Sequence, residues 1–476
     1  MTSVMTSVMT SAMPQTLFDK IWARHLVGAR ADGKHLLYMD RHAVHELHAP
    51  HAFGLLDESG REVRRSDLTL VVQDHTVPTR PGVIRISPHI EATQKAGARH
   101  RVQVLDVNDP DHGIVHVVTP ELGIALPGLT LACPDSHAST VGAIGCLAFG
   151  CGTTELVHVL STQVMAMEKP RQIRIWLDGQ LSDWVNAKDV ALALIRQLGV
   201  SAGRGAAVEY AGPVIEAMDI ESRMTLCNMT IEWGGRTCLI APDAKTLAWC
   251  QGRRGAPQGT AWDEALVWWK TLHSDAGAVF DEEHRLDCSA LSPQVTWGTD
   301  PGQAIGIQEA VPDPLTLAGS AQERTARALT YMAVPGGQSL VGLPVDRVFI
   351  GSCSNARLPD LRAAARVAEG RRVAAGVQAW VVPGSSAIKR QAEAEGLDRI
   401  FEQAGFEWRE AGCSMCAGAN GDVGTAGQRC VSTTNRNFEN RQGRDVRTHL
   451  TSPAMAAAAA VTGQLVDVRT LMETPA

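Results

Sequence analysis

The stretches VFIGSCSNAR (348–357) and AGCSMCAG (411–418) carry the three cysteines on which the interpretation of this chain depends. Cys353 follows a β-rich run at 347–350, whereas Cys413 and Cys416 form a C-x-x-C pair much later in the chain. Both stretches are rich in Gly and Ser, so we expect loops whose backbone N–H groups can hydrogen-bond the sulfurs of a bound cluster. The C-x-x-C spacing lets two thiolates turn toward one centre, and a third thiolate from the distant loop completes a face.

Three kinds of site compete for these cysteines. A structural zinc site requires four ligands, and the nearest candidates, Cys430 and His449, are not at finger-like spacing. A thioredoxin-like motif would place C-x-x-C after the first strand of a small domain, which does not fit this position. A cluster with three cysteine ligands fits better, because an iron without a protein ligand can bind substrate oxygens as a Lewis acid. The spacing by itself leaves these alternatives open.

Short β-rich runs alternate with helical patterns along the chain, which predicts an α/β fold with largely parallel sheets. The expected strands are 68–72, 113–118, 173–177, 347–350 and 379–382, and the expected helices are 188–198, 322–332 and 360–369. The Ala-rich segment 455–461 is too short to span a membrane and suits a packed helix. Neither a P-loop nor the Rossmann glycine pattern is present, so nucleotide binding has no support.

The length of 476 residues predicts about three domains. Gly- and Pro-rich loops suggest boundaries near 200–205 and 311–314, which gives expected subdomains at 15–200, 201–311 and 312–467. Residues 1–14 repeat Thr-Ser-Val-Met and are expected to form a disordered tail. They lack the basic and apolar regions of a secretory signal, so the cytoplasm is the expected location.

Composition excludes several other classes of protein. The formal net charge of −7 provides no basic excess for nucleic acid, and no run of about 18 apolar residues predicts a membrane span. Eleven cysteines without a secretion signal do not indicate a disulfide framework. Cys146, Cys151, Cys227 and Cys238 are isolated in apolar surroundings, and we interpret them as small buried hydrophobic residues.

The chain resembles the large subunits of the 3-isopropylmalate dehydratase family, within the aconitase superfamily, from about residue 15 to 467. Long stretches carry this resemblance: LLYMDRHAVHEL, GIVHVVTPELGIALPG, DSHASTVGAIG, MTLCNMTIE, LSPQVTWGTDPGQ, VFIGSCSNAR, GCSMCAG, NRNFENRQGR and THLTSPAMAAAAAVTG. It implies three α/β/α subdomains around an iron–sulfur cluster, without the swivelling fourth domain of single-chain aconitases.

The resemblance also implies a cofactor and a reaction. One [4Fe–4S] cluster per subunit would be held by Cys353, Cys413 and Cys416. The implied activity is that of a hydro-lyase, which converts 2-isopropylmalate to 3-isopropylmalate by dehydration and rehydration in leucine biosynthesis. Such chemistry needs a Lewis acid on the hydroxyl, a base, an acid for the leaving oxygen, and cations for the carboxylates.

The residues that match the family's site supply these chemical types. The resemblance assigns catalysis to Asp74, His75, His116, Asp135, Ser136, His137 and Glu209. It assigns substrate binding to Asn435, Arg436 and Arg441, since the planar guanidinium forms bidentate hydrogen bonds with carboxylates. By contrast, we interpret the histidines of the RHAVHELHAPH segment, His42, His45, His48 and His51, as scaffold.

Several positions near these motifs depart from the family pattern. Ala138 stands where Thr is usual, Ser354 and Ala356 alter the usual CTNSR sequence, and Asn440 replaces a usual Gly. Asp445-Val446 replaces a usual Gly-Gly, and the run 417–419 is less bulky than usual. None of these changes removes a cluster ligand. They favour, as an alternative, a paralogue that isomerises another 2-substituted malate in a specialised pathway.

The resemblance further implies a partner. The sequence stops shortly after the third-subdomain signature, so we expect a separate small subunit that carries the swivelling domain and completes the active site in a heterodimer or heterotetramer. An RNA-binding regulator is an alternative from another class, because some aconitase relatives bind RNA after losing their cluster. The net charge of −7 argues against it. Retention of the cysteines and Asp–His pairs argues against an inactive scaffold.

Overall fold

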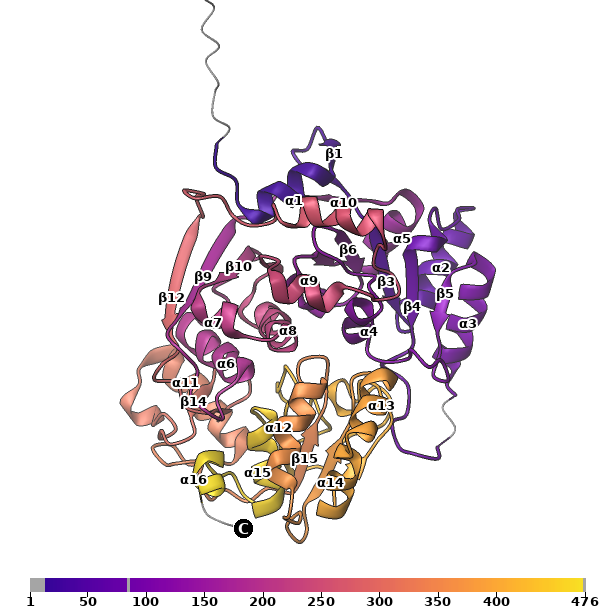
Figure 1. Ribbon diagram of the computed structural model, residues 1–476. Coiled ribbons are helices and arrows are strands. Elements are labelled where there is room, and N and C mark those ends of the chain that lie inside the picture. The colour runs from indigo at the N-terminus through magenta and orange to yellow at the C-terminus, as the bar shows by residue number, and fades with distance from the viewer. Residues whose placement is uncertain (1–12, 84–85, 474–476) are drawn as a thin grey trace, which may run out of the picture.

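Three parallel β-sheets organise the chain in the computed structural model, which describes residues 13–83 and 86–473 (Figure 1). The first sheet has the order β5-β4-β3-β6-β7, the second β11-β10-β9-β12, and the third β17-β16-β15-β18-β19. Every strand pair in these sheets is parallel. The predicted α/β class with parallel sheets is therefore confirmed. The tail expected at 1–14 lies, apart from Met13 and Pro14, outside the described residues.

The strands are short. Those of the first sheet are β3 (Arg41–His45), β4 (Thr69–Val72), β5 (Gln103–Leu105), β6 (Thr130–Cys133) and β7 (Leu147–Gly150). Those of the second are β9 (Gln172–Asp178), β10 (Ala207–Ala211), β11 (Thr237–Ile240) and β12 (Glu282–Asp287). Those of the third are β15 (Arg347–Ile350), β16 (Gln378–Val381), β17 (Glu407–Trp408), β18 (Arg429–Ser432) and β19 (Arg447–Leu450). Two small antiparallel sheets contain β1 (Leu26–Ala29), β2 (His35–Tyr38) and β8 (Val164–Met167), and β13 (Gln294–Thr296) and β14 (Ala304–Gly306).

Helices connect and cover the sheets. They are α1 (Leu17–His25), α2 (Ala49–Glu58), α3 (Pro88–His100), α4 (Val115–Glu121), α5 (Thr153–Thr162), α6 (Ala187–Leu198), α7 (Pro213–Ala217), α8 (Ile220–Asn228), α9 (Ala244–Cys250), α10 (Thr260–Trp269), α11 (Gly319–Met332), α12 (Leu358–Ala368), α13 (Ser386–Ala394), α14 (Leu397–Ala404), α15 (Pro453–Thr462) and α16 (Val468–Glu473). The Ala-rich helix α15 packs against α12 and β15, as its predicted buried position requires.

One predicted strand is wrong. The run at 113–118 is rich in β-branched residues, yet Val115–Glu121 is the helix α4. The backbone N–H of Val115, in the first turn, donates to the buried carboxylate of Asp74 at 2.8 Å. This bond satisfies a helix N-terminal donor that would otherwise lack a partner, so a tertiary contact overrides the local strand preference.

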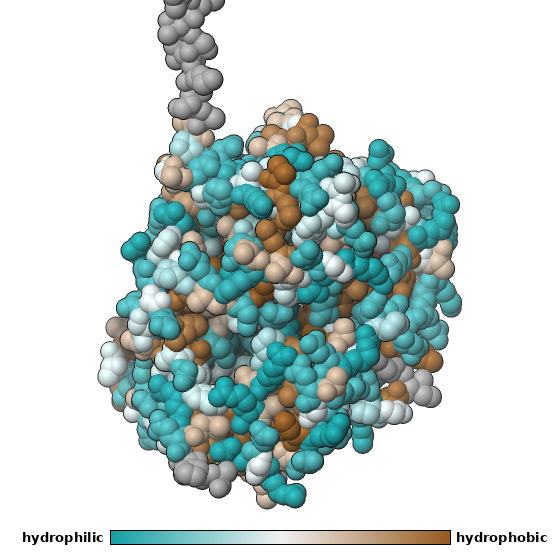
Figure 2. All heavy atoms as spheres, viewed as in Figure 1, coloured by the Kyte–Doolittle hydropathy of each residue, from teal (hydrophilic) through white to brown (hydrophobic). Residues whose placement is uncertain are grey.

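The strands β9 and β10 lie on opposite sides of the expected boundary near residue 200, and they are hydrogen-bonded neighbours in one sheet. The three expected subdomain ranges stay a prediction. One apolar core joins the first and second sheets, and a second core surrounds the third sheet. The molecular face in Figure 2 is mostly hydrophilic. No helix within 13–83 or 86–473 is long and apolar enough to cross a membrane.

Candidate active site

The carboxyl ends of three neighbouring parallel strands bring acidic and histidine side chains together. His45 ends β3 and is followed by Glu46, Asp74 and His75 follow β4, and Asp135 follows β6. Since parallel strands end at the same edge of their sheet, side chains that are distant in sequence converge there. Asp135 also caps the 3₁₀ helix Ser136–Ile144, because its carboxylate accepts the N–H of His137 at 2.7 Å.

The three predicted cluster cysteines converge from two loops of the third sheet. Cys353 follows β15, and Cys413 precedes and Cys416 ends the single 3₁₀ turn Ser414–Cys416. The hydroxyl of Ser352 lies 3.2 Å from Cys416 Sγ and 4.0 Å from Cys353 Sγ. Burial, together with the nearby Cys416, raises the pKa of the Cys353 thiol to about 12. Burial likewise raises the pKa of Cys413, and Asp74, Cys416 and Cys353 add to that rise.

Polar side chains surround the sulfurs. The Nδ2 atoms of Asn228 and Asn435 donate to Cys353 Sγ at 3.2 and 3.4 Å. The Cys416 thiol lies 3.7 Å from Asn435 Oδ1. Ser352 holds a left-handed backbone conformation (φ 83°), a conformation that is unfavourable for a residue with a side chain and that concentrates at functional sites. Three buried thiols with amide and hydroxyl donors at hand fit the requirements of an iron–sulfur cluster.

The side chains that could complete a zinc site are bound elsewhere. Cys430 Sγ faces the carbonyl of Val431. His449 is hydrogen-bonded to Arg429 Nη1 at 2.7 Å and to the Thr296 carbonyl at 2.6 Å. Neither residue therefore offers a fourth ligand to the three cysteines.

Three acid–imidazole pairs lie next to one another. His75 Nδ1 is 2.6 Å from Asp74 Oδ1, and His116 Nε2 is 2.8 Å from Asp135 Oδ1. His137 Nε2 is 2.8 Å from an oxygen of Glu232. Asp135 connects the pairs, since its other oxygen lies 3.9 Å from His75 Nε2. The backbone N–H of Cys413 donates to the Asp74 carbonyl at 3.0 Å, which attaches the cysteine loop to this group.

Charge pairing controls the protonation of this group. Burial alone would lower the pKa of His75, but the Asp74 carboxylate, with Glu46 and Asp135, outweighs it and raises that pKa to about 10. Burial acts to raise the pKa of Asp135, yet His116 and His137 hold it well below its usual range. His75 is therefore protonated at neutral pH, as a proton donor must be. Asp135 is ionised, so it can pair with the neighbouring imidazoles.

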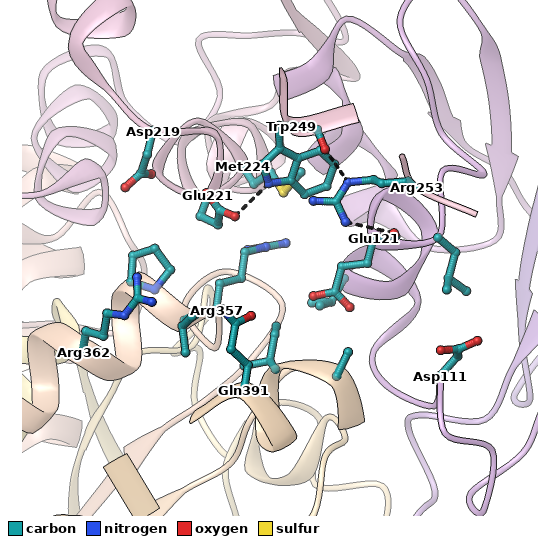
Figure 3. Close-up of a pocket in the computed structure, with 16 residues that line it drawn as sticks. Asp111, Glu121, Asp219, Glu221, Met224, Trp249, Arg253, Arg357, Arg362 and Gln391 are labelled. Carbon is teal, nitrogen blue, oxygen red and sulfur yellow. Dashed lines mark hydrogen bonds between the residues drawn. The ribbon is translucent and has the colours of Figure 1, made fainter. Parts of the chain in front are cut away.

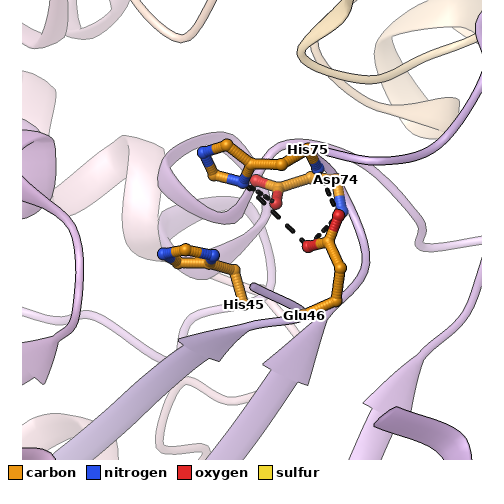
Figure 4. A group of neighbouring side chains, drawn as sticks. All are labelled: His45, Glu46, Asp74 and His75. Atoms are coloured by element: carbon orange, nitrogen blue, oxygen red, sulfur yellow. Dashed lines mark hydrogen bonds and ion pairs between the residues drawn. The ribbon is translucent and has the colours of Figure 1, made fainter. Parts of the chain in front are cut away.

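Figure 4 shows Asp74 and His75 with two residues that no sequence motif places at the site, His45 and Glu46. The His45 and His75 rings lie 4.4 Å apart, so the scaffold interpretation of the 42–51 histidines overlooked one contact with the site. Glu46 accepts hydrogen bonds from the backbone N–H groups of Asp74, His75 and Thr76 at 3.1, 2.7 and 2.5 Å. Glu46 thereby holds the turn that presents His75.

The group in Figure 4 also has the composition of a metal site, since ligand atoms of its four residues lie within 4.8 Å of one another. Its carboxylate oxygens are already in use, however. Asp74 binds His75 and the N–H of Val115, and both oxygens of Glu46 accept backbone donors. This internal pairing fits a proton-handling group better than a metal centre.

The loop between β18 and β19, which we call the arginine loop, also reaches the acid–imidazole pairs. Arg436 Nε binds Glu232 at 2.9 Å, and its Nη2 donates to the Ser136 hydroxyl at 2.8 Å. The backbone of Arg441 lies beside Gly418, two residues after Cys416. Its Nε is buried and has no hydrogen-bond partner among the described residues, so it is available to a ligand. Asn435 and Arg436 are thus at the site, and Arg441 lies close to the cysteine loop.

One predicted site residue is misplaced. Glu209 lies within β10, where its carboxylate accepts a hydrogen bond from Ser274 Oγ at 2.7 Å, and the structure does not bring it to the cysteines. A different glutamate, Glu232, lies beside the acid–imidazole pairs and binds both His137 and Arg436. Glu232 and Asn228 both lie within the quoted stretch MTLCNMTIE (224–232), but no spacing within that stretch marks either of them as a site residue.

A cavity of about 530 Å³ is separate from this site (Figure 3). Trp249, Arg253 and Glu121 are among the residues that line it, and none of the cysteines or acid–imidazole pairs does. Arg357 connects the two regions, because it lines the cavity while its Nη1 donates to the Cys353 carbonyl at 2.8 Å.

Comparison with known proteins identifies a family model and solved structures that match this chain. A model of the aconitase family (aconitate hydratase) matches residues 19–463. The chain is also similar to the crystal structure of aconitase X from Thermococcus kodakaraensis in its holo form, with 11% sequence identity and a TM-score of 0.45. That match covers 92% of this chain and 90% of the other.

Proposed function

This chain belongs to the aconitase family of hydro-lyases, and on that premise we propose that it is the large subunit of a 3-isopropylmalate dehydratase. The observation that carries the proposal is the convergence of three buried thiols, Cys353, Cys413 and Cys416, on three acid–imidazole pairs. The contact between the Cys413 N–H and the Asp74 carbonyl joins these two halves.

A [4Fe–4S] cluster would be held by the three cysteines, and when bound it supplies a Lewis acid for the substrate hydroxyl. His75 is protonated at neutral pH and can donate a proton to the departing oxygen, while Asp74 keeps its ring in place. Arg436 and Arg441 can bind the two substrate carboxylates. Arg436 is already oriented by Glu232, and Arg441 has a free buried donor.

The side chain of the substrate needs a direct test. We expect the reconstituted enzyme to turn over 2-isopropylmalate with a higher kcat/KM than citrate, homocitrate, citramalate or bulkier 2-substituted malates. A fully buried alanine, Ala138, adjoins His137 where the family usually has Thr, and it motivates the alternative of a paralogue for another malate. A preference for one of the other malates in this panel would replace the leading proposal by that alternative.

We further propose that a small subunit completes the site. The resemblance assigns the carbon base to a serine of that partner, and the hydroxyl of Ser136 is already engaged by Arg436. Two apolar side chains on the cysteine and arginine loops are exposed, Val423 (43%) and Phe438 (50%). Val423 lies against Gly418, and Arg441 lies over the Phe438 ring, so each side chain contacts a loop residue close to the cysteines.

The cluster-loaded chain alone should therefore turn over almost no substrate. An open site is water-filled, which weakens electrostatic stabilisation, and it also lacks the carbon base. Turnover measured against added small subunit should rise as a binding curve. Phe438→Ser should shift that curve to higher partner concentration, whereas Leu315→Ser, a matched change at an exposed residue far along the chain from both loops, should not. Full activity of the chain without any partner would show that the base lies in these 476 residues.

A further inference from the structure

Lys188 is a fully buried cation that the acid–base chemistry above does not use. It occupies the first turn of α6 and is 0% exposed. Its Nζ donates to the Thr433 carbonyl at 3.1 Å and the Thr434 carbonyl at 2.5 Å, with Met229 Sδ at 3.8 Å. Across the described ranges, no carboxylate oxygen lies within 4.0 Å of this ammonium.

This position is electrostatically unfavourable for a cation. A buried charge without an ionic partner is costly, because carbonyl dipoles replace only part of its hydration. The N-terminal turn of a helix adds a further penalty, since the helix dipole is positive there. The adjacent Asp189 forms no ion pair with Lys188, because its carboxylate accepts the N–H groups of Asn186 and Gln294. An anion in the vicinity would remove the imbalance.

The groups around Lys188 identify that anion. The two carbonyls it binds immediately precede Asn435, which contacts the sulfurs of Cys353 and Cys416. Burial lowers the pKa of Lys188 to about 8, and Cys416, Glu232, Cys353 and Asp360 oppose this lowering, in that order. Glu232 is already paired with His137 and Arg436, and Asp360 accepts from Asn355 Nδ2 and the Arg357 N–H. The thiols become thiolates when they bind metal, so ligation would create negative charge on Cys353 and Cys416, near the lysine.

We propose that Lys188 is a positioning residue and the buried counter-charge of the cysteine-bound cluster. Its ammonium binds the carbonyls of residues 433 and 434. This contact fixes the loop that places Asn435 against the sulfurs of Cys353 and Cys416. It also offsets the charge of the three thiolates. This inference rests on the proposed function, because it takes the three cysteines to be cluster ligands. It predicts that Lys188 stabilises the loaded protein far more than the protein without iron.

The test compares Lys188→Met with Lys188→Arg, each with and without reconstituted iron and sulfide. Lys188→Met should lower the Tm of the loaded protein clearly more than that of the iron-free protein. In the iron-free form, the loss of two carbonyl hydrogen bonds is offset by removal of a buried charge without an ion-pair partner. The loaded variant should release iron to a chelator roughly 10- to 100-fold faster than wild type, as expected when a partner of the metal ligands is lost. Lys188→Arg keeps the charge and should retain most of the wild-type iron.

Asp189→Asn is the matched control, since it lies on the same turn and is equally buried but binds backbone groups. It should lower the Tm of both forms to a similar extent. Equal loss of Tm in both forms of Lys188→Met, with wild-type iron retention, would overturn the counter-charge role. So would iron loss in Lys188→Arg as severe as in Lys188→Met. Failure of the wild-type protein to take up iron would instead refute the cofactor itself.

Discussion

Replacing Cys416 by serine should prevent stable retention of the cluster and abolish turnover. Anaerobically prepared wild-type protein should hold about four irons per chain and show broad thiolate-to-iron absorption, because a cysteine-ligated cubane contains four irons. Serine cannot supply the soft thiolate, and Cys416 is one of only three ligands proposed here. Iron content, visible absorption and turnover of 2-isopropylmalate with the small subunit present measure the effect.

The control for this prediction is Cys250→Ser. Cys250 is also buried, but it ends α9. Burial raises the pKa of its thiol to about 12, although the nearby Arg253 acts to lower it. Its replacement should leave the iron content and absorption unchanged. Equal cluster loss in the two variants would argue against the ligand assignment. Exposure of wild-type protein to air should release the iron that lacks a cysteine ligand and end activity.

His75→Ala should lower kcat by roughly 10²–10⁴-fold while the iron content stays at the wild-type value, since a general acid contributes about that much. The pKa of His75 is raised to about 10, so its proton-donating form is present below that pH and is lost as the pH rises through it. Wild-type turnover limited by this group should therefore decline only in alkaline solution. Rate measurements across pH, at saturating partner and substrate, test both expectations.

His48→Ala is the matched control for His75→Ala. His48 lies near the same strand ends, but it is partly exposed and its ring contacts His45 rather than the acid–imidazole pairs. It should keep nearly wild-type kcat. Near-normal turnover in a folded, iron-loaded His75→Ala protein would remove His75 from the mechanism. Loss of iron in that variant would instead show that the Asp74–His75 turn supports the Cys413 loop.

Much of the site was predictable because many of its reactive residues lie close together in short segments of the sequence. Cys413 and Cys416 are neighbours on one turn, and Asp74 and His75 are adjacent in the chain and bonded in the structure. The strand at 347–350 was predictable too, because a short apolar run before a Gly- and Ser-rich loop is typical of a parallel strand and its carboxyl end. Local patterns of this kind survive folding when tertiary contacts agree with them.

Other features depended on contacts that no local pattern encodes. The segment at 115–121 is helical because Asp74, far away in the sequence, accepts its first free N–H group. Glu209 and Glu232 are the same residue type. The strand β10 places Glu209 beside Ser274, whereas the 3₁₀ helix Met229–Trp233 places Glu232 beside His137. The packing of the first sheet against the second therefore decides which of the two carboxylates reaches the site.

The sequence by itself determined the α/β class, the three cysteines and the Asp–His neighbours, because strand periodicity and the chemistry of adjacent residues are local properties. The tertiary structure alone decided that Glu232 binds His137, that Glu46 holds the His75 turn, and that Lys188 binds the Thr434 carbonyl next to Asn435. These contacts join elements of different sheets. Their energies depend on burial and on charges brought together only when the sheets pack, so they cannot be read from neighbouring residues.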